Sequence, residues 1–302
     1  MIRYRAYVLV FSLALATLSA GLNADVPQKL RLEIEGHPFA LWHKTAVDPE
    51  RVILLIHGRT WSTLPDFDLQ VEGESLSLMD GLVERGFSVY GLDLRGYGQT
   101  PRDESGWLTP QRAADDVLHA LRFIAQRETT MPGPILFGWS LGSMVAQLSV
   151  QIDPQAVSGL VLFGYPVRDG MMVDPEDLGA LPPRAPTTAE NAASDFILPD
   201  SISAAAVRGF VSAALAADPI RMDWRHVNQW QALDGSRITT PTLLMEGAHD
   251  PLTQSDVHAR LFTRVTHSNR MWIVLPDGAH AAFMESPRDQ FLAAIALFAE
   301  NL

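Results

Sequence analysis

Short apolar runs alternate with amphipathic stretches along most of the chain. Runs with the length of strands fall at residues 30–35, 39–43, 51–57, 87–94, 135–137, 157–163, 242–246 and 271–275. Stretches with helical periodicity fall at 76–85, 110–126, 143–148, 255–265 and 288–299. Gly36 lies between the first two runs, which favours an antiparallel hairpin. Strands alternating with helices are typical of a parallel sheet covered on both faces. We therefore predict an α/β fold with a mostly parallel, eight-stranded sheet flanked by helices.

One long interruption breaks this alternation at residues 166–240. It is rich in alanine, proline and aspartate, and the stretches 201–217 and 223–233 have a helical pattern. A connection of about 75 residues is too long for a structureless loop. We expect a helical cap over 166–240, inserted into an α/β core of 25–165 and 241–302. In open α/β sheets ligands bind at the carboxyl edge, where this cap would lie. Trp224 and Trp230 would either line a pocket there or hold the cap on the core.

Composition narrows the possible classes of function. The 302 residues include 35 Asp and Glu against 23 Lys and Arg, which gives a formal net charge of -12. Such an acidic chain offers no basic patch for phosphate, which argues against nucleic acid and anionic membranes as partners. The chain has no cysteine, which excludes disulfides, thiolate metal sites and a cysteine nucleophile. No histidine and carboxylate spacing resembles a metal-binding helix. We therefore expect no metal and no cofactor.

The first 24 residues have the pattern of a secretory signal peptide. Arg3 and Arg5 open the segment, residues 6–20 are uncharged and largely apolar, and small residues lead to Ala24. The apolar part is too short for a spanning helix. We expect cleavage after Ala24, with Ala20 as another possible site and an uncleaved anchor as the alternative. The protein would then be periplasmic or secreted, with no stable membrane insertion. Loss of the two arginines and no acid would move the formal charge from -12 to -14.

The pentapeptide from Gly138 to Gly142, G-W-S-L-G, carries the strongest chemical signal. It lies between an apolar run and a helical stretch, as in the nucleophile elbow, a sharp turn that exposes a serine hydroxyl. Glycines are needed there because a Cβ would collide with the neighbouring strand and helix. The N-terminus of the helix also favours a developing oxyanion. We predict Ser140 as a nucleophile, the alternative being an ordinary small-residue turn.

A serine nucleophile needs a base, and the base needs a group that fixes its tautomer. The run 242–246 leads to Asp250, and the run 271–275 leads to His280. Both residues therefore lie on loops at the carboxyl ends of strands, in the chain order Ser…Asp…His of this architecture. We predict that Ser140, His280 and Asp250 form a catalytic triad.

With these motifs the chain resembles the α/β-hydrolase fold over nearly its whole length, from Leu30 to Phe298. The segment His57-Gly58-Arg59-Thr60 is similar to the family's H-G-x-x oxyanion loop. The resemblance implies that His57 is structural and that the backbone N–H groups of Arg59 and Leu141 bind the oxyanion. The Arg59 side chain would either select an anionic substrate group or point to solvent.

Three other residues compete for roles in the triad. His249 is a possible base, but a sequence neighbour of Asp250 points away from the partner that it must face. Asp277 precedes His280 by three residues and more simply shapes the turn. Asp93 lies in a D-x-R-G-x-G segment that also resembles the family, where that segment is structural. The chain order favours Asp250 over Asp93 as the acid.

The resemblance implies a serine hydrolase that acts through an acyl-enzyme on a small molecule. A carboxylesterase for small to medium esters is the favoured interpretation. Lactonase, C–C bond hydrolase and cofactor-free haloperoxidase-like activities use the same triad and stay open. Serine rather than aspartate at the elbow argues against epoxide hydrolases and haloalkane dehalogenases. A non-catalytic ligand-binding homologue is the other class, although such a protein normally lacks a triad member.

Overall fold

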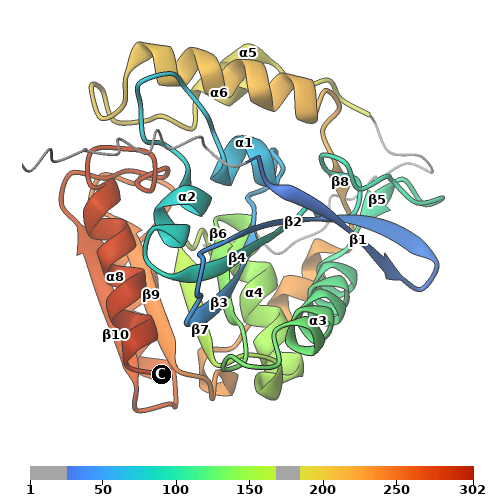
Figure 1. Ribbon diagram of the computed structural model, residues 1–302, viewed down its shortest axis with the longest axis vertical. Coiled ribbons are helices and arrows are strands. Elements are labelled where there is room, and N and C mark those ends of the chain that lie inside the picture. The colour runs from blue at the N-terminus through green and yellow to red at the C-terminus, as the bar shows by residue number, and fades with distance from the viewer. Residues whose placement is uncertain (1–25, 168–183) are drawn as a thin grey trace, which may run out of the picture.

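An eight-stranded mixed sheet lies at the centre of the computed structural model, which describes residues 26–167 and 184–302 (Figure 1). The predicted signal peptide lies outside these ranges. The sheet has the order β1-β2-β4-β3-β6-β7-β9-β10. Its strands are β1 (Gln28–Ile34), β2 (His37–Thr45), β3 (Arg51–Ile56), β4 (Phe87–Leu92), β6 (Ile135–Trp139), β7 (Gly159–Phe163), β9 (Thr242–Gly247) and β10 (Arg270–Leu275). β2 pairs antiparallel with β1 and β4, and the other pairs are parallel. The predicted α/β fold is confirmed.

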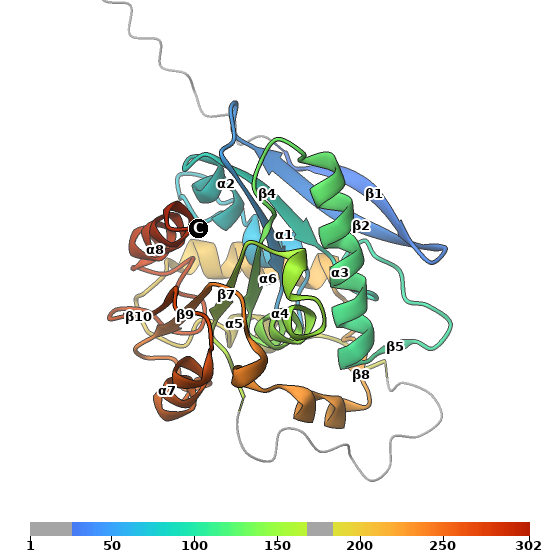
Figure 2. The same cartoon turned by 90° about the horizontal axis from the view of Figure 1, so that it is seen from below.

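Helices cover both faces of the sheet. The α-helices of the described ranges are α1 (Thr63–Phe67), α2 (Leu78–Val83), α3 (Pro110–Arg127), α4 (Leu141–Ile152), α5 (Ala189–Ala193), α6 (Ala204–Ala217), α7 (Ser255–Arg264) and α8 (Arg288–Glu300). In Figure 2, α3 and α4 lie on one side of the sheet, and α2 and α8 lie on the other. Successive β3 side chains point to opposite faces, so Leu54 packs in the core under α3 and α4, and Leu55 in the core under α2 and α8. Burial on both faces explains the continuous apolar run of this strand.

Local signals in the sequence account for several element boundaries. The Thr109 side chain accepts a hydrogen bond from the Arg112 N–H and caps α3, with Pro110 in the first turn. The predicted helix at 110–126 is therefore confirmed. Glu35 and Gly36 both have positive φ, 51° and 78°, as a two-residue hairpin turn between β1 and β2 requires.

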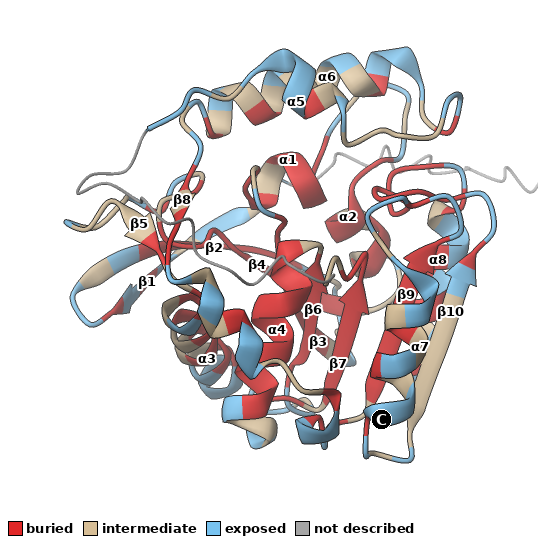
Figure 3. Cartoon of the chain, turned by 180° about the vertical axis from the view of Figure 1, so that it is seen from behind, coloured by how far each residue is buried: buried red, intermediate tan, exposed pale blue. Residues whose placement is uncertain are grey.

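Helices α5 and α6 lie across the top of the molecule, above α1 (Figure 1). The outer surface of α6 is exposed, whereas its residues Phe210 and Ala214 are buried (Figure 3). This agrees with the helix expected at 201–217, with Ser203 as its N-cap. Residues 168–183 of the predicted cap lie outside the described ranges, and the division into core and cap stays a prediction. Among the described helices, none is long and apolar enough to cross a membrane.

The expectation of a helix over 223–233 is wrong. The segment forms a two-residue strand, β8 (Asp223–Trp224), followed by a 3₁₀ turn, η2 (Val227–Ala232). β8 pairs in parallel with β5 (Trp107–Leu108), and the Arg225 N–H donates to the Leu108 carbonyl at 2.9 Å. Pairing with a distant strand thus overrides a weak helical preference. Two further 3₁₀ turns are η1 (Pro154–Ala156) and η3 (Gly235–Arg237).

Candidate active site

Ser140 lies on the sharp turn between β6 and α4. Its backbone has φ 54° and ψ -123°, a strained conformation for a residue with a Cβ. Its N–H donates to the Phe163 carbonyl at 2.9 Å, which holds the turn against β7. A Cβ on Gly138 would lie 2.3 Å from the Gly142 oxygen, and one on Gly142 would lie 2.3 Å from the Ile56 oxygen. The two glycines therefore let the strand and helix meet, as the pentapeptide predicts.

His280 and Asp250 form a buried hydrogen-bonded pair at the ends of β10 and β9. The His280 Nδ1 lies 2.7 Å from Asp250 Oδ2, and both side chains are almost fully buried. The other Asp250 oxygen accepts from the Leu252 N–H at 2.9 Å. The Trp139 indole donates to the His280 carbonyl at 2.7 Å and fixes the loop. A bond through Nδ1 leaves Nε2 as the ring nitrogen available to a hydroxyl.

A cavity of about 310 Å³ brings Ser140 and His280 together. Its lining residues come from both the sheet edge and the segment above it. They are Gly58, Arg59, Thr60, Trp61, Asp66, Trp139, Ser140, Leu141, Pro166, Asp195, Arg221, Leu252 and His280. The predicted oxyanion residues Arg59 and Leu141 thus border the same space as the serine. Trp224 and Trp230 do not line it, so of their two expected roles the packing role holds.

The loop after β3 passes close to the serine. A Cβ on Gly58 would lie 3.6 Å from the Ser140 Cβ, so this backbone approaches the elbow closely. His57 supports the loop from below: its Nδ1 donates to the Gly58 carbonyl at 2.9 Å, and its Nε2 accepts from the Leu94 N–H at 3.0 Å. Complete burial lowers the His57 pKa to about 4, which keeps the ring neutral. These contacts agree with a structural role for His57.

The rival candidates do not join the pair. Asp93 is buried and accepts from the Trp42 indole at 3.0 Å and from the N–H groups of Gln99 at 3.0 Å and Thr63 at 3.1 Å. Its carboxylate is thereby committed to the loop around it. His249 and Asp277 are exposed.

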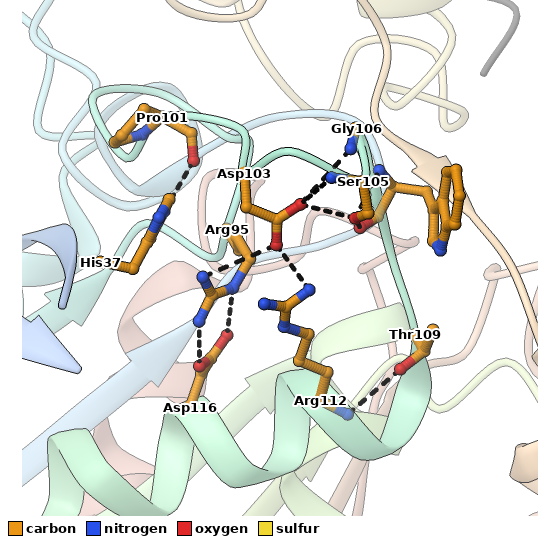
Figure 4. Close-up of polar contacts among 10 residues, drawn as sticks. His37, Arg95, Pro101, Asp103, Ser105, Gly106, Thr109, Arg112 and Asp116 are labelled. Carbon is orange, nitrogen blue, oxygen red and sulfur yellow. Dashed lines mark hydrogen bonds and ion pairs between the residues drawn. The ribbon is translucent and has the colours of Figure 1, made fainter. Parts of the chain in front are cut away.

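Arg95, in the same segment as Asp93, belongs to a separate ionic network (Figure 4). Its guanidinium forms two bonds to Asp116 on α3, at 2.7 and 3.1 Å, and lies 3.7 Å from Asp103. Asp103 also pairs with Arg112 at 2.5 Å. The network fixes the loop before α3 and lies outside the cavity.

Several residues that the sequence patterns did not identify also line the cavity, among them Trp61, Asp66, Asp195 and Arg221. Trp61 follows the His57–Thr60 motif directly, and this proximity could have identified it. The Trp61 indole donates to Asp195 Oδ2 at 2.9 Å, and the Gly58 N–H donates to Asp66 Oδ2 at 3.3 Å. Burial raises the pKa of Asp66 well above its ordinary value and that of Asp195 to about 6.

The raised pKa of Asp195 predicts a pH-dependent loss of stability. In the folded protein this pKa is about 6, against a reference value of 3.8. The stability from this group is complete below pH 3.8 and is lost as the pH rises through 6. Asp195→Asn, which keeps an acceptor for Trp61, should therefore raise the melting temperature at pH 8 by roughly 2 °C or more. The gain should shrink as the pH falls from 6 to 4. An equal gain at both ends of this range, or the same profile in the exposed control Asp277→Asn, would contradict the prediction.

The chain matches the family of serine aminopeptidases S33 (Hydrolase_4) over residues 48–287. No curated protein shows significant sequence similarity to it. Similar solved structures include a soluble variant of monoglyceride lipase from Saccharomyces cerevisiae, with 17% identity, a TM-score of 0.67 and coverage of 90% of this chain and 94% of that chain. A hydrolase from Pseudomonas aeruginosa PA01 has 21% identity, a TM-score of 0.63 and coverage of 92% and 99%. The thioesterase domain from the curacin biosynthetic pathway has 18% identity, a TM-score of 0.61 and coverage of 91% and 100%.

Similarity at these identities supports the fold alone, whereas the family match spans most of the sequence and includes the serine elbow. In the described ranges no cluster of three or more His, Asp or Glu side chains could hold a metal ion. The chain therefore belongs to the serine aminopeptidase S33 family of the α/β-hydrolase fold and is a serine hydrolase.

Proposed function

We propose that the protein is a carboxylesterase that cleaves small to medium esters through an acyl-enzyme. The observation that carries the proposal is the His280–Asp250 pair at 2.7 Å, bordering the same cavity as a serine held at positive φ. This set of groups provides a nucleophile, a base with one ring nitrogen free, and a carboxylate that holds the base in the required tautomer.

In the proposed reaction His280 Nε2 removes the Ser140 proton while Oγ attacks the acyl carbon. Asp250 stabilises the imidazolium that forms and remains ionised. The N–H groups of Arg59 and Leu141 receive the negative charge of the tetrahedral intermediate, each donor contributing about 3 kcal/mol in comparable holes. The imidazolium then protonates the leaving alcohol. Water activated by the same histidine releases the acid and restores the enzyme.

The volume of the cavity supports a substrate of modest size. About 310 Å³ is near the lower end of the range for small-molecule sites. Hydrolysis of 4-nitrophenyl esters from acetate to octanoate, with lactones alongside, would test the proposal. A fluorophosphonate probe should label the wild type and leave Ser140→Ala unlabelled. Labelling without hydrolysis of any ester would instead favour a lactonase or a C–C bond hydrolase.

Trp61 is expected to limit the length of the acyl chain, because its buried ring lines the cavity. Trp61→Ala should move the maximum of kcat/KM toward longer esters. Trp224→Ala is a matched control, since Trp224 is equally buried but lies outside the cavity, with its indole 2.8 Å from the Tyr97 hydroxyl. Both changes should cost about 3–5 kcal/mol of stability. If both variants have the wild-type length profile, Trp61 does not set chain length.

We also propose that the protein acts outside the cytoplasm, after removal of residues 1–24. The positive start, apolar centre and small residues before Asp25 support this proposal. N-terminal sequencing of protein recovered from the periplasm or medium should begin at Asp25. A chain that retains Met1 in the cytoplasm would exclude export.

A further inference from the structure

Two arginines, Arg59 and Arg221, line the active-site cavity. Arg59 follows β3 and Arg221 precedes β8, and both border the space that contains Ser140. Among the described residues, neither guanidinium forms an ion pair with an acidic side chain. Arg95 and Arg112 show the contrasting case, since both are engaged by carboxylates around α3 (Figure 4). In a chain with a net charge of -12, two such arginines beside a nucleophile need an explanation.

The acidic side chains near the two arginines, Asp223 and Asp218, form their contacts with other groups. Asp223 lies 2.9 Å from the Arg225 Nε. Asp218 accepts from the N–H groups of Ser62 and Gly98, each at 2.8 Å. The positive charges of Arg59 and Arg221 are therefore only partly balanced within the described structure.

In the described structure the two carboxyls of the cavity itself, Asp66 and Asp195, form no ion pair with these arginines. Asp66 accepts from the Gly58 N–H, and Asp195 accepts from the Trp61 indole. Burial raises the pKa of both carboxyls, that of Asp195 to about 6, so that Asp195 is neutral only below this pH. Desolvation and then the neighbouring charge of Arg221 lower the pKa of Arg59, as is expected where two guanidinium groups lie near each other.

Hydrogen bonds from neighbouring side chains hold the backbone of both arginines in place. The Arg102 guanidinium donates to the Arg221 carbonyl at 3.1 Å. The Tyr97 hydroxyl donates to the Arg59 carbonyl and accepts from the Trp224 indole at 2.8 Å. One tyrosine therefore connects the loop that carries Arg59 to the strand that follows Arg221. These contacts fix the backbone at both arginines, whose side chains are exposed at the cavity.

We propose that Arg59 and Arg221 bind a carboxylate on the substrate, so that the preferred esters are anionic. This inference rests on the proposed esterase function and names the substrate class for the same site. A carboxylate between the two guanidinium groups would relieve their repulsion and form paired, charge-assisted hydrogen bonds. The small cavity requires the carboxylate and the scissile carbonyl to be only a few atoms apart.

The first test compares anionic and neutral esters of matched length. One arm uses 4-nitrophenyl hydrogen glutarate against 4-nitrophenyl pentanoate, which puts the carboxylate on the acyl side. The other arm uses the butyrate ester of glycolate against propyl butyrate, which puts it on the alcohol side. In at least one arm, kcat/KM should be about tenfold higher for the anionic ester. Equal or lower values for the anionic ester in both arms would overturn the inference.

Substitutions of the two arginines test whether they cause the preference for anionic esters. Arg221→Gln and Arg59→Gln should each lower the anionic-to-neutral ratio of kcat/KM about tenfold, mainly through KM. Arg221→Lys should retain most of the ratio because it keeps the charge. Arg208→Gln is the matched control, because Arg208 is an exposed arginine on α6 that does not line the cavity, and it should keep the wild-type ratio. An unchanged ratio in both glutamine variants would refute the assignment.

A binding measurement separates failure of this inference from failure of the proposed function. Ser140→Ala protein is titrated calorimetrically with monomethyl glutarate and with methyl pentanoate. The anionic ester should bind at least about tenfold more tightly, and Arg221→Gln in the Ser140→Ala background should remove the difference. This result would support the anion site even if no ester were hydrolysed. Equal binding of the two esters would refute the site, whatever the activity of the wild type.

Discussion

Ser140→Ala and His280→Ala should each reduce ester hydrolysis by a factor on the order of 10⁴–10⁶ in kcat. The double variant should be little worse than either single one, because a nucleophile and its base act as one unit. Residual activity would come from the oxyanion donors and from binding alone. Stopped-flow and long-time assays with one 4-nitrophenyl ester would cover this range of rates.

Ser149→Ala is a suitable control for the serine change. Ser149 lies on α4, the helix that begins after Ser140, and its hydroxyl donates to the Val145 carbonyl at 2.9 Å within that helix. This variant should keep normal activity. Near-normal turnover in Ser140→Ala or in His280→Ala would require another nucleophile or base.

Asp250→Asn should lower kcat by about 10⁴ while the fold stays intact. An amide at this position can donate to His280 Nδ1, which would move the ring proton to Nε2 and block proton transfer from the serine. Circular dichroism and the melting temperature should change little, because Asn is nearly the same size as Asp. The size of the loss depends on the single 2.7 Å contact between Asp250 and His280.

Asp93→Asn gives the complementary result. Its carboxylate accepts from Trp42, Thr63 and Gln99, and an amide can accept through only one of its two terminal atoms. The change should cost about 1–3 kcal/mol of stability and leave kcat of the remaining folded enzyme near normal. A stable, inactive Asp93→Asn combined with an active Asp250→Asn would reassign the acid.

The alternating pattern of the chain was sufficient to predict the sheet and most helices. Buried strands such as β3 are apolar on both faces, and α3 carries both a capping threonine and a proline in its first turn. The pentapeptide around Ser140 predicted its own geometry, since only glycines permit the close approach of β6, α4 and β3. These features depend on local sequence and on burial, and the spacing of apolar residues along the chain reflects burial directly.

The features that could not be predicted depend on distant partners. Trp224 lies in a strand rather than a helix because β5, more than a hundred residues earlier, offers it a pairing edge. Arg221 and Asp195 reach the cavity because the segment above the sheet folds back over Ser140. A single arginine or aspartate in a polar stretch has no periodic signature. This part of the cavity lining therefore could not be predicted from the sequence, unlike Ser140, His280, Arg59 and Leu141.

The short β5–β8 pair has a consequence for recombining related hydrolases. The upper segment is joined to the core by this pair, by the Arg225 to Leu108 hydrogen bond and by the contact between Trp224 and Tyr97. A chimera that exchanged only residues 166–240 would leave the donor's strand without its matching edge. An exchange of residues 166–240 should therefore include at least residues 97–108 from the same parent.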